Sequence, residues 1–256
     1  MKILVTNDDG VYAEGLWTLV RAIMDNADVL VVAPDREQSG VGTSVTLHQP
    51  LRMREVEPPV KGIETYCVEG TPADSVILGL RVLAKEGIDL VMSGINYGLN
   101  LGNDVFISGT VGGALQAHFN NIPAVALSCE FENGDVHFDP AARLAKSLTK
   151  HVSQNGLRSG TLLNINFPLL TFGEIQGIEL TRIGGRSYRD EVRKGNDGRR
   201  EYYWIVQERR EWDNEEGTDI GAIQQRKISV TPFQTNLTDS GQIDALNTLC
   251  SSVFSE

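Results

Sequence analysis

The stretch that decides the fold is Lys2–Gly10, with the sequence KILVTNDDG. Its first five residues are mostly apolar and β-branched, which predicts a short buried strand. Two adjacent acids and a glycine then end the strand. The stretch at 14–26 follows, and its apolar residues recur at the spacing of one helical face. A buried strand that runs through a polar turn into a helix is the opening unit of a parallel α/β sheet.

The same alternation continues through the first two thirds of the chain. Thr71-Pro72-Ala73-Asp74 combines a hydroxyl cap, an early proline and an acid three residues later, which predicts a helix start. The other predicted helices are 110–119 and 139–153, and the predicted strands after the first are 28–33, 89–93, 124–128 and 161–166. Strands that alternate with helices predict an α/β fold whose mainly parallel sheet is covered on both faces.

The pattern changes after residue 168. Strands are predicted at 202–206 and 227–231, separated by a charged, glycine-containing stretch, and a terminal helix at 242–254. We therefore divide the chain into a catalytic core at 1–168 and a segment at 169–256. The second segment is predicted to form a projecting β-hairpin arm and a terminal helix that contribute to oligomerisation.

Composition excludes several classes of protein. The net charge of −11 leaves no field of Lys and Arg for the phosphates of a nucleic acid, so we expect no nucleic-acid partner. Cys67, Cys129 and Cys250 are far apart and form no CxxC pair, which favours a reduced, cytoplasmic protein without a zinc site. No apolar run is long enough for a signal sequence or a membrane span, so we expect no membrane partner.

The most informative polar residues follow three predicted strands. Asp8 and Asp9 follow the first strand, Ser39 lies after the second, and Asn96 lies after the third. In a doubly wound sheet these loops meet at the carboxyl edge, where ligands bind. Two carboxylates about 4 Å apart repel by about 4 kcal/mol at an effective dielectric constant near 20, and oxygen donors suit Mg²⁺ or Mn²⁺.

A simpler interpretation of each residue competes with the metal site. Asp8 and Asp9 followed by Gly10 also fit a turn with two solvated acids, and for this pair alone the two interpretations are about equally supported. Ser39 and Asn96 taken singly are better explained as ordinary loop and turn residues. Only the convergence of the three loops at one sheet edge favours the metal site.

A second polar segment precedes the predicted helix at 110–119. Ser108, Gly109 and Thr110 open that helix with small residues and exposed N–H groups, which fits an anion site as well as a capped, closely packed helix. P-loop, Gly-x-Ser-x-Gly, Gly-x-Gly-x-x-Gly and HExxH motifs do not occur in the sequence. A phospho-receiver domain would need an acid after the third strand, where Ser93 and Gly94 stand instead.

Taken together, these segments resemble the survival protein E (SurE) family of nucleotidases. The matching segments lie in order along residues 1–238; they are 3–10, 33–40, 70–74, 93–100, 108–112, 164–168, 181–188, 217–219 and 229–232. The resemblance implies a Rossmann-like core with a protruding hairpin. It also implies a homodimer or homotetramer that exchanges its C-terminal part between protomers. The chain departs from the family pattern at Arg226, Lys227 and Asn236, so the resemblance does not fix substrate preference or the details of subunit packing.

The resemblance implies hydrolysis of nucleoside 5′-monophosphates, and in some members 3′-monophosphates and short polyphosphates. It implies one divalent cation per subunit, Mg²⁺ or Mn²⁺, with ligands that fall on Asp8, Asp9, Ser39 and Asn96. We expect Asp8 and Asp9 to be catalytic, with Asp8 orienting or deprotonating the attacking water. The residues expected to contact substrate are Asn7, Asn96, Ser108, Gly109 and Thr110.

Two alternatives stay open at this point. Asp8 can instead act as a covalent nucleophile that forms an aspartyl-phosphate. A protein of another class, a non-catalytic nucleotide-binding or signalling module, would use the same loops without releasing phosphate.

Overall fold

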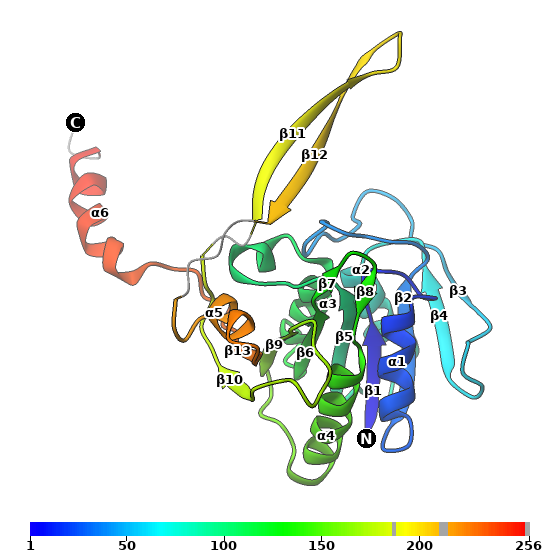
Figure 1. Ribbon diagram of the computed structural model, residues 1–256. Helices are drawn as coiled ribbons and strands as arrows, with labels where there is room; N and C mark the ends of the chain where they lie inside the picture. Colours follow the sequence, from blue (N-terminus) through cyan, green and yellow to red (C-terminus); the bar gives the residue numbers. More distant parts are fainter. Residues whose placement is uncertain (186–187, 210–214, 254–256) are drawn as a thin grey trace.

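The computed structural model describes residues 1–185, 188–209 and 215–253, and one sheet organises them. The strands of this sheet are β1 (Lys2–Thr6), β2 (Asp28–Pro34), β3 (Met53–Glu55), β4 (Glu64–Val68), β5 (Leu90–Tyr97), β6 (Ala124–Cys129), β9 (Leu162–Phe167), β10 (Ile178–Leu180) and β13 (Ile228–Pro232). Their order across the sheet is β10-β13-β9-β6-β5-β1-β2-β4-β3 (Figure 1). All neighbouring pairs from β9 to β4 are parallel, whereas β13 is antiparallel to β9 and β3 to β4. The predicted mainly parallel sheet is confirmed.

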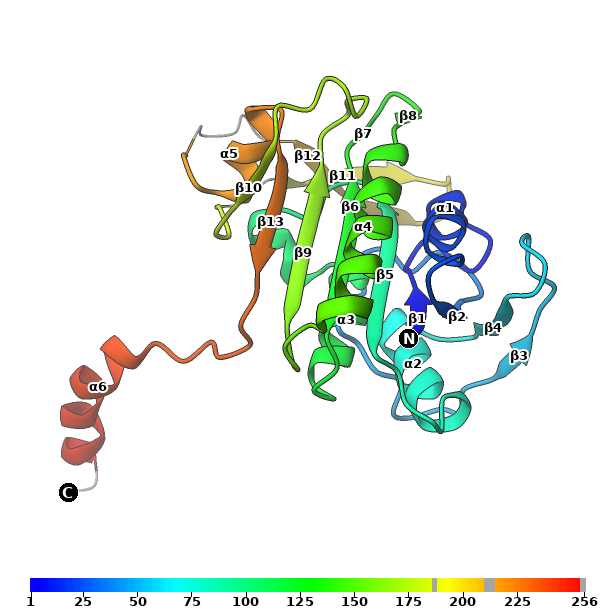
Figure 2. The ribbon, with the colours of Figure 1, turned by 90° about the horizontal axis from the view of Figure 1, so that it is seen from below.

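Two pairs of helices cover the sheet, one pair on each face (Figures 1 and 2). The helices are α1 (Glu14–Ile23), α2 (Pro72–Leu78), α3 (Gly109–His118) and α4 (Asp139–Asn155). Alternate residues of β1 point to opposite faces, as the pleat of a strand requires. Ile3 and Val5 pack with α1 and α4, while Leu4 packs with α2 and α3. Both faces of β1 are therefore buried, which explains why its sequence is a continuous apolar run.

The connection from β6 to β9 has an unusual hand. The β1–α1–β2 connection moves one way across the sheet, and β5–α3–β6 moves the other way with its helix on the opposite face. In both connections the helix lies on the face of the sheet that a right-handed crossover requires. The β6–α4–β9 connection moves in the same direction as β5–α3–β6, yet α4 lies on the face of α1. It is therefore left-handed, and it contains the small hairpin of β7 (Phe131–Glu132) and β8 (Asp135–Val136).

The C-terminal third contributes to the sheet and also projects from it. A separate antiparallel hairpin, β11 (Tyr188–Asn196) and β12 (Glu201–Arg209), extends beyond the edge of the sheet at which β1 ends (Figure 1). A short helix, α5 (Asp219–Gln224), precedes β13. Helix α6 (Ser240–Val253) stands away from the sheet at the end of an extended segment, as both views show (Figures 1 and 2).

Several observed elements were not predicted, among them β3, β4, β10 and α5, whereas the predicted elements differ from the observed ones mainly at their ends. Helix α1 ends at Ile23 instead of residue 26, and α2 gives way to a π-helical turn at Gly79–Leu83. Strand β5 extends to Tyr97, four residues past the predicted end. The predicted strand at 227–231 corresponds to β13, which pairs with β9 in the main sheet, while the strand at 202–206 lies in the projecting hairpin. Among the described residues no helix is long and apolar enough to cross a membrane.

One buried carboxylate connects the C-terminal segment to the core. Asp219 begins α5 and accepts hydrogen bonds from the main-chain N–H groups of Gly102 and Gly184, both at 2.8 Å, and of Ile220 at 2.9 Å. These three groups belong to segments that are far apart in the sequence. Asp219 thereby fixes the loop that precedes α3 against α5.

Replacing this carboxylate tests the connection. In the variant Asp219→Asn, one buried N–H group loses its acceptor, which costs about 1–3 kcal/mol of the free energy of unfolding. We expect the midpoint of thermal unfolding to fall by several degrees. The same change at the exposed Asp25 is the control and is expected to leave the midpoint unchanged. Equal midpoints for the two variants would contradict the assigned role of Asp219.

Candidate functional site

The three polar loops of the predicted site follow adjacent strands. β1 lies between β2 and β5, and Val5 pairs with Val31 while Thr6 pairs with Ser93. The carboxyl ends of these strands are therefore side by side. The chain builds the sheet outward from β1 in both directions, and ligands of doubly wound sheets bind at such a reversal of strand order.

Asp8 is buried against the first turn of α3. The hydroxyl of Thr110 donates a short hydrogen bond to Oδ1 of Asp8, and the main-chain N–H of Thr110 also donates to this carboxylate. The partial positive charge of the helix N-terminus therefore faces the acid. A Cβ atom on Gly109 would lie 2.8 Å from both Cβ and Oδ2 of Asp8, so only glycine allows this close approach.

Both carboxylates are electrostatically unsatisfied. Burial raises the pKa of Asp8, and the hydrogen bonds from Thr110 only partly oppose this effect. Burial, followed by the charge of Asp8, raises the pKa of Asp9 from 3.8 to about 7. The charge of Glu37 raises both pKa values further. Among the described residues, no Lys or Arg forms an ion pair with any of these three acids.

The end of β5 places Asn96 and Tyr97 at the same edge. The pairing of β5 with β6 shifts by one residue between Ser93 and Asn96, and such a bulge re-aims the side chains that follow it. The main-chain N–H of Tyr97 donates to Oδ2 of Asp9 at 3.3 Å. The amide of Asn96 donates to the carbonyl oxygen of Gly98 at 2.8 Å, which leaves Oδ1 of Asn96 available to another partner.

The loop after β2 brings Ser39 to the turn after β1. The main-chain N–H of Gln38 donates to the carbonyl oxygen of Asp8 at 2.7 Å. The exposed hydroxyl of Ser39 donates to Oε1 of Glu37 at 2.7 Å. Because this bond uses the hydroxyl proton, the lone pairs of the Ser39 oxygen stay free to bind a cation.

A second buried carboxylate holds the rest of this loop. Asp74 accepts hydrogen bonds from the main-chain N–H of Thr46 at 2.9 Å and from its hydroxyl at 2.7 Å. It also closes the predicted capping box with Thr71, whose hydroxyl donates to the carbonyl oxygen of Ser44. The start of α2 therefore fixes the segment that follows Ser39.

A buried cluster of amides supports the loop after β5. The sequence alone predicted no role for this cluster. The carbonyl oxygen of Asn100 accepts from the side chains of Asn164 at 2.8 Å and Asn166 at 3.1 Å. Its main-chain N–H donates to Asn166, and its side chain donates to Ser128. The sequence nevertheless contains a signal for this cluster. Two asparagines two residues apart lie on one face of an otherwise apolar strand, and this pattern predicts a buried polar partner.

Two residues predicted to contact substrate have structural partners here. The side chain of Asn7 is fully buried and donates to the carbonyl oxygen of Gly10 at 3.0 Å. The hydroxyl of Ser108 accepts from the main-chain N–H of Val111 and caps α3. Contact of either side chain with a substrate therefore stays a prediction.

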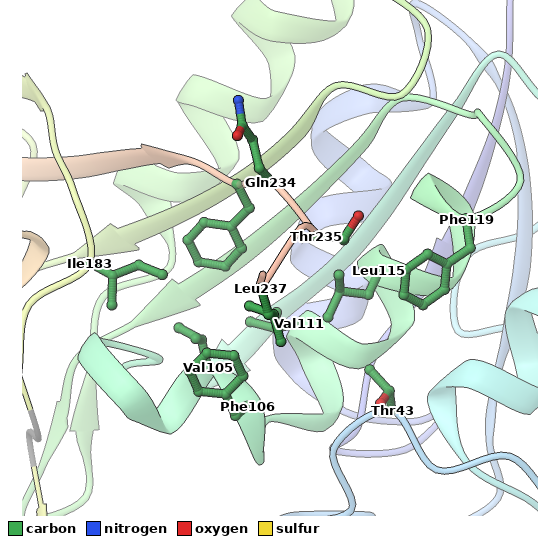
Figure 3. A pocket seen from close by; sticks show the side chains of 11 residues that line it. Thr43, Val105, Phe106, Val111, Leu115, Phe119, Ile183, Gln234, Thr235 and Leu237 are labelled. Atoms are coloured by element: carbon green, nitrogen blue, oxygen red, sulfur yellow. The ribbon is translucent and has the colours of Figure 1, made fainter. Parts of the chain in front are cut away.

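An open cavity of about 310 Å³ adjoins the carboxylates. Asp9, Ser39 and Glu37 line one part of it, and Tyr97 and Phe138 line another. A separate cavity of about 220 Å³ lies between α3 and the segment after β13, with Phe106, Phe119 and Leu237 in its wall (Figure 3). In the described part of the chain, the lining of this second cavity contains no acid or base, whereas the first is lined by the acids Asp9, Glu14 and Glu37.

The donor set suits a hard cation of the magnesium type. No group of three or more His, Cys, Asp and Glu side chains that could hold a metal occurs in the described ranges. The predicted ligands form a different set, with two carboxylates, Asp8 and Asp9, and two neutral oxygens, on Ser39 and Asn96. Such oxygen ligands bind Mg²⁺ and Mn²⁺ in proteins.

Fold and site together define an α/β protein with a doubly wound sheet and a carboxylate site at its carboxyl edge. The family model described as Survival protein SurE matches residues 3–190. The 5'-nucleotidase SurE of Moorella thermoacetica is 46% identical over 242 residues, covering 93% of this chain and 92% of that protein. The 5'-nucleotidase SurE of Dehalococcoides mccartyi is 43% identical over 238 residues, covering 93% and 90%.

A solved structure supports the same relationship over nearly the whole chain. The crystal structure of SurE protein from Aquifex aeolicus has a TM-score of 0.83 and 40% sequence identity, and covers 97% of this chain and 99% of that one. The chain belongs to the SurE family. The resemblance predicted from the sequence motifs is confirmed.

The raised pKa of Asp9, which is due to burial and to the charge of Asp8, makes stability depend on pH. Because the pKa of Asp9 is about 7 in the folded protein and 3.8 in the reference state, the folded protein binds more protons between these values. In EDTA, the free energy of unfolding therefore falls as pH rises from 5 to 8. Asp9→Asn removes this contribution and is expected to be more stable than wild type at pH 8, with a smaller difference at pH 5. Thermal unfolding of both proteins across this range tests the sign, and parallel pH profiles would contradict it.

Proposed function

We propose that this protein is a phosphoric monoester hydrolase that converts nucleoside 5′-monophosphates to nucleosides and phosphate. The observation that carries the proposal is the pair of neighbouring carboxylates Asp8, which is buried, and Asp9, which is partly buried and lines the cavity. Among the described residues, neither forms an ion pair with Lys or Arg. Relatives named 5'-nucleotidase SurE match more than nine tenths of the chain, which supports the same activity here.

A divalent cation completes this site. Asp8, Asp9, Ser39 and Asn96 would hold it. Burial and the neighbouring charge of Asp8 raise the pKa of Asp9, and a cation would offset both effects. When bound, such a cation withdraws charge from the phosphate and neutralises part of the charge of the transition state. Phosphate release measured with Mg²⁺ and with Mn²⁺ distinguishes the two cations.

Asp8 is the residue that orients the attacking water and accepts its proton. The water oxygen forms a bond to phosphorus and gives a proton to Asp8, the bond from phosphorus to the 5′ oxygen breaks, and that oxygen takes a proton from solvent as the nucleoside leaves. Asp8 then releases its proton to solvent. Burial raises the pKa of Asp8, which brings the carboxylate closer to the range in which a general base works well near neutral pH. Thr110 holds Oδ1 of Asp8, so one oxygen of the carboxylate is left for the water.

Thr110 has a structural partner in Asp8, and its predicted contact with the substrate stays a prediction. Its hydroxyl and main-chain N–H both point to Asp8, so we assign it to positioning the base. Ser108 caps the same helix. The partial positive charge at the start of α3 nevertheless lies next to the acid, where it favours an anionic group.

We also propose a homo-oligomer in the cytoplasm, as a homodimer or homotetramer. Helix α6 stands away from the sheet and exposes Ile243, Leu246 and Val253. An isolated helix of this length is marginal in water, and a second copy would bury its apolar side chains.

The first test is phosphate release from a panel of nucleoside monophosphates with EDTA, Mg²⁺ or Mn²⁺. We expect release by the wild type only with a divalent cation, and a loss of at least a hundredfold in Asp8→Asn, which can no longer accept a proton. Asp25→Asn is the matched control and should retain full activity. Asp25 is exposed and precedes the start of β2, so it lies at the opposite edge of the sheet from the carboxyl ends of the strands.

The same panel separates the enzyme from the alternative class. A non-catalytic nucleotide-binding module would bind nucleotide by calorimetry without releasing phosphate under any metal condition, and that result would overturn the enzyme. Trapping of a phosphorylated aspartate would replace water attack with a covalent intermediate on Asp8. Metal binding by calorimetry, weakened in Asp8→Asn and Asp9→Asn, tests the cation site without relying on activity.

The close approach of α3 to Asp8 gives an independent prediction. In Gly109→Ala, the added methyl group must displace either the helix or the carboxylate, because its carbon would lie 2.8 Å from Asp8. We expect a fall of about tenfold to a hundredfold in kcat for phosphate release. Gly173→Ala is the control, since nothing lies within 4 Å of its added carbon. Full activity of Gly109→Ala would contradict the packing described here.

A further inference from the structure

Beside the carboxylates lies an aromatic surface that the hydrolytic mechanism does not use. The rings of Tyr97 and Phe131 lie 4.2 Å apart between centroids, and the ring of Phe138 lies 6.1 Å from that of Tyr97. Tyr97 is 41% exposed and Phe131 is 42% exposed, so both rings present a large part of their surface to solvent. Exposed aromatic rings that gather in this way commonly mark a binding surface.

The surface is fixed in position relative to the site. The main-chain N–H of Tyr97 donates to Asp9, and its hydroxyl donates to the carbonyl oxygen of Gly134 at 3.2 Å. Gly134 and Asn133 form the two-residue turn of the β7–β8 hairpin, both with positive φ. Such Asn-Gly turns are the favoured, well-defined hairpin turns. A ring held at both ends loses little conformational entropy when it binds a partner.

The cavity joins this surface to the carboxylates. Tyr97 and Phe138 line the same 310 Å³ space as Asp9 and Ser39, a volume within the usual range for small-molecule sites. A ligand with an anionic group at one end and a flat ring at the other fits this arrangement. A nucleoside monophosphate is such a ligand.

The charges of the cavity favour a neutral group beside the phosphate. Glu37 lines the cavity in addition to Asp9, and so does Glu14, whose carboxylate is paired with Arg21 at 2.8 Å. Asp9 and Glu37 repel a second phosphate, as in a polyphosphate chain, but they accept hydrogen bonds from hydroxyl or amino groups. The structure therefore favours a nucleoside over a longer anion in this position.

We propose that Tyr97, backed by Phe131 and Phe138, is the platform on which the base of the substrate stacks, an inference that rests on the proposed function. Every base has a flat π-surface, so stacking tolerates all of them. Among the residues that the structure describes, the lining of the cavity contains no Asn, Gln, Lys or Arg to read a base edge. The platform therefore favours larger rings over smaller ones and sets no strict choice of base.

The test compares a substrate with a base and one without. The ratio of kcat/KM for AMP to that for ribose 5-phosphate isolates the contribution of the base from that of the phosphate site. We expect Tyr97→Ala to lower this ratio about tenfold, the change that the loss of about 1.4 kcal/mol of stacking produces. Tyr97→Phe keeps the ring and should keep the ratio. Phe172→Ala, which removes an exposed aromatic ring that packs on Arg143, is the matched control and should also keep it.

Two results would overturn the platform. One is a wild type that prefers AMP to ribose 5-phosphate by less than twofold. The other is a Tyr97→Ala variant that loses activity equally on both substrates, because this would show that Tyr97 acts only through the position of Asp9.

Binding of adenosine separates this proposal from the proposed function. Adenosine lacks the phosphate, so calorimetry with the wild type and Tyr97→Ala measures the platform without catalysis. Weaker binding of adenosine to Tyr97→Ala supports the platform even if the wild type releases no phosphate and the enzyme proposal fails. Equal binding to both proteins, or no binding to the wild type, overturns the platform even if nucleotides are hydrolysed.

Discussion

The arrangement of the site depends on the contact between the Asp8 carboxylate and the first turn of α3. Burying the neighbouring carboxylates Asp8 and Asp9 at the carboxyl edge of the sheet is unfavourable. The raised pKa values of both groups, which are due mainly to burial, indicate this cost. The hydroxyl and N–H of Thr110 offset part of this cost, and the partial charge of the helix N-terminus adds to the effect. The helix reaches the acid only because residue 109 is glycine. The remaining repulsion is what makes the edge receptive to a cation.

The loops around this pair are held by buried polar groups from distant parts of the chain. Asp74 fixes the loop after β2, Asp219 fixes the loop before α3, and the amides around Asn100 fix the loop after β5. Loops on a protein surface are ordinarily the most mobile segments, and catalysis requires reacting groups to stay within a fraction of an ångström. Buried acceptors that bind main-chain N–H groups provide this rigidity, since leaving those groups unpaired is costly.

The sequence predicted the parallel core and the convergence of Asp8, Asp9, Ser39 and Asn96, because apolar periodicity and strand-end position are local signals. It did not predict the bulge in β5, since the shift depends on how β6 pairs with its neighbour. It also left open where the strand at 227–231 lies, because pairing with β9 is decided by contacts across more than 60 residues. The roles of Thr110 and Asn100 required the structure for the same reason. Each is defined by a partner that is distant in sequence and carries no local pattern.

An acidic protein that acts on an anionic substrate must change the sign of its field locally. The net charge of −11 and the carboxylates of Asp9 and Glu37 around the cavity oppose the approach of a phosphate. The proposed cation, held by Asp8 and Asp9, would reverse the field over a few ångströms only, because solvent and salt screen it beyond that distance. The rest of the substrate therefore lies in a region that still repels anions. The proposed platform of uncharged rings at Tyr97 and Phe131 would give this part of the substrate a contact that carries no charge. A Lys or Arg in its place would attract the substrate, but it would also pair with the carboxylates that are needed to hold the cation.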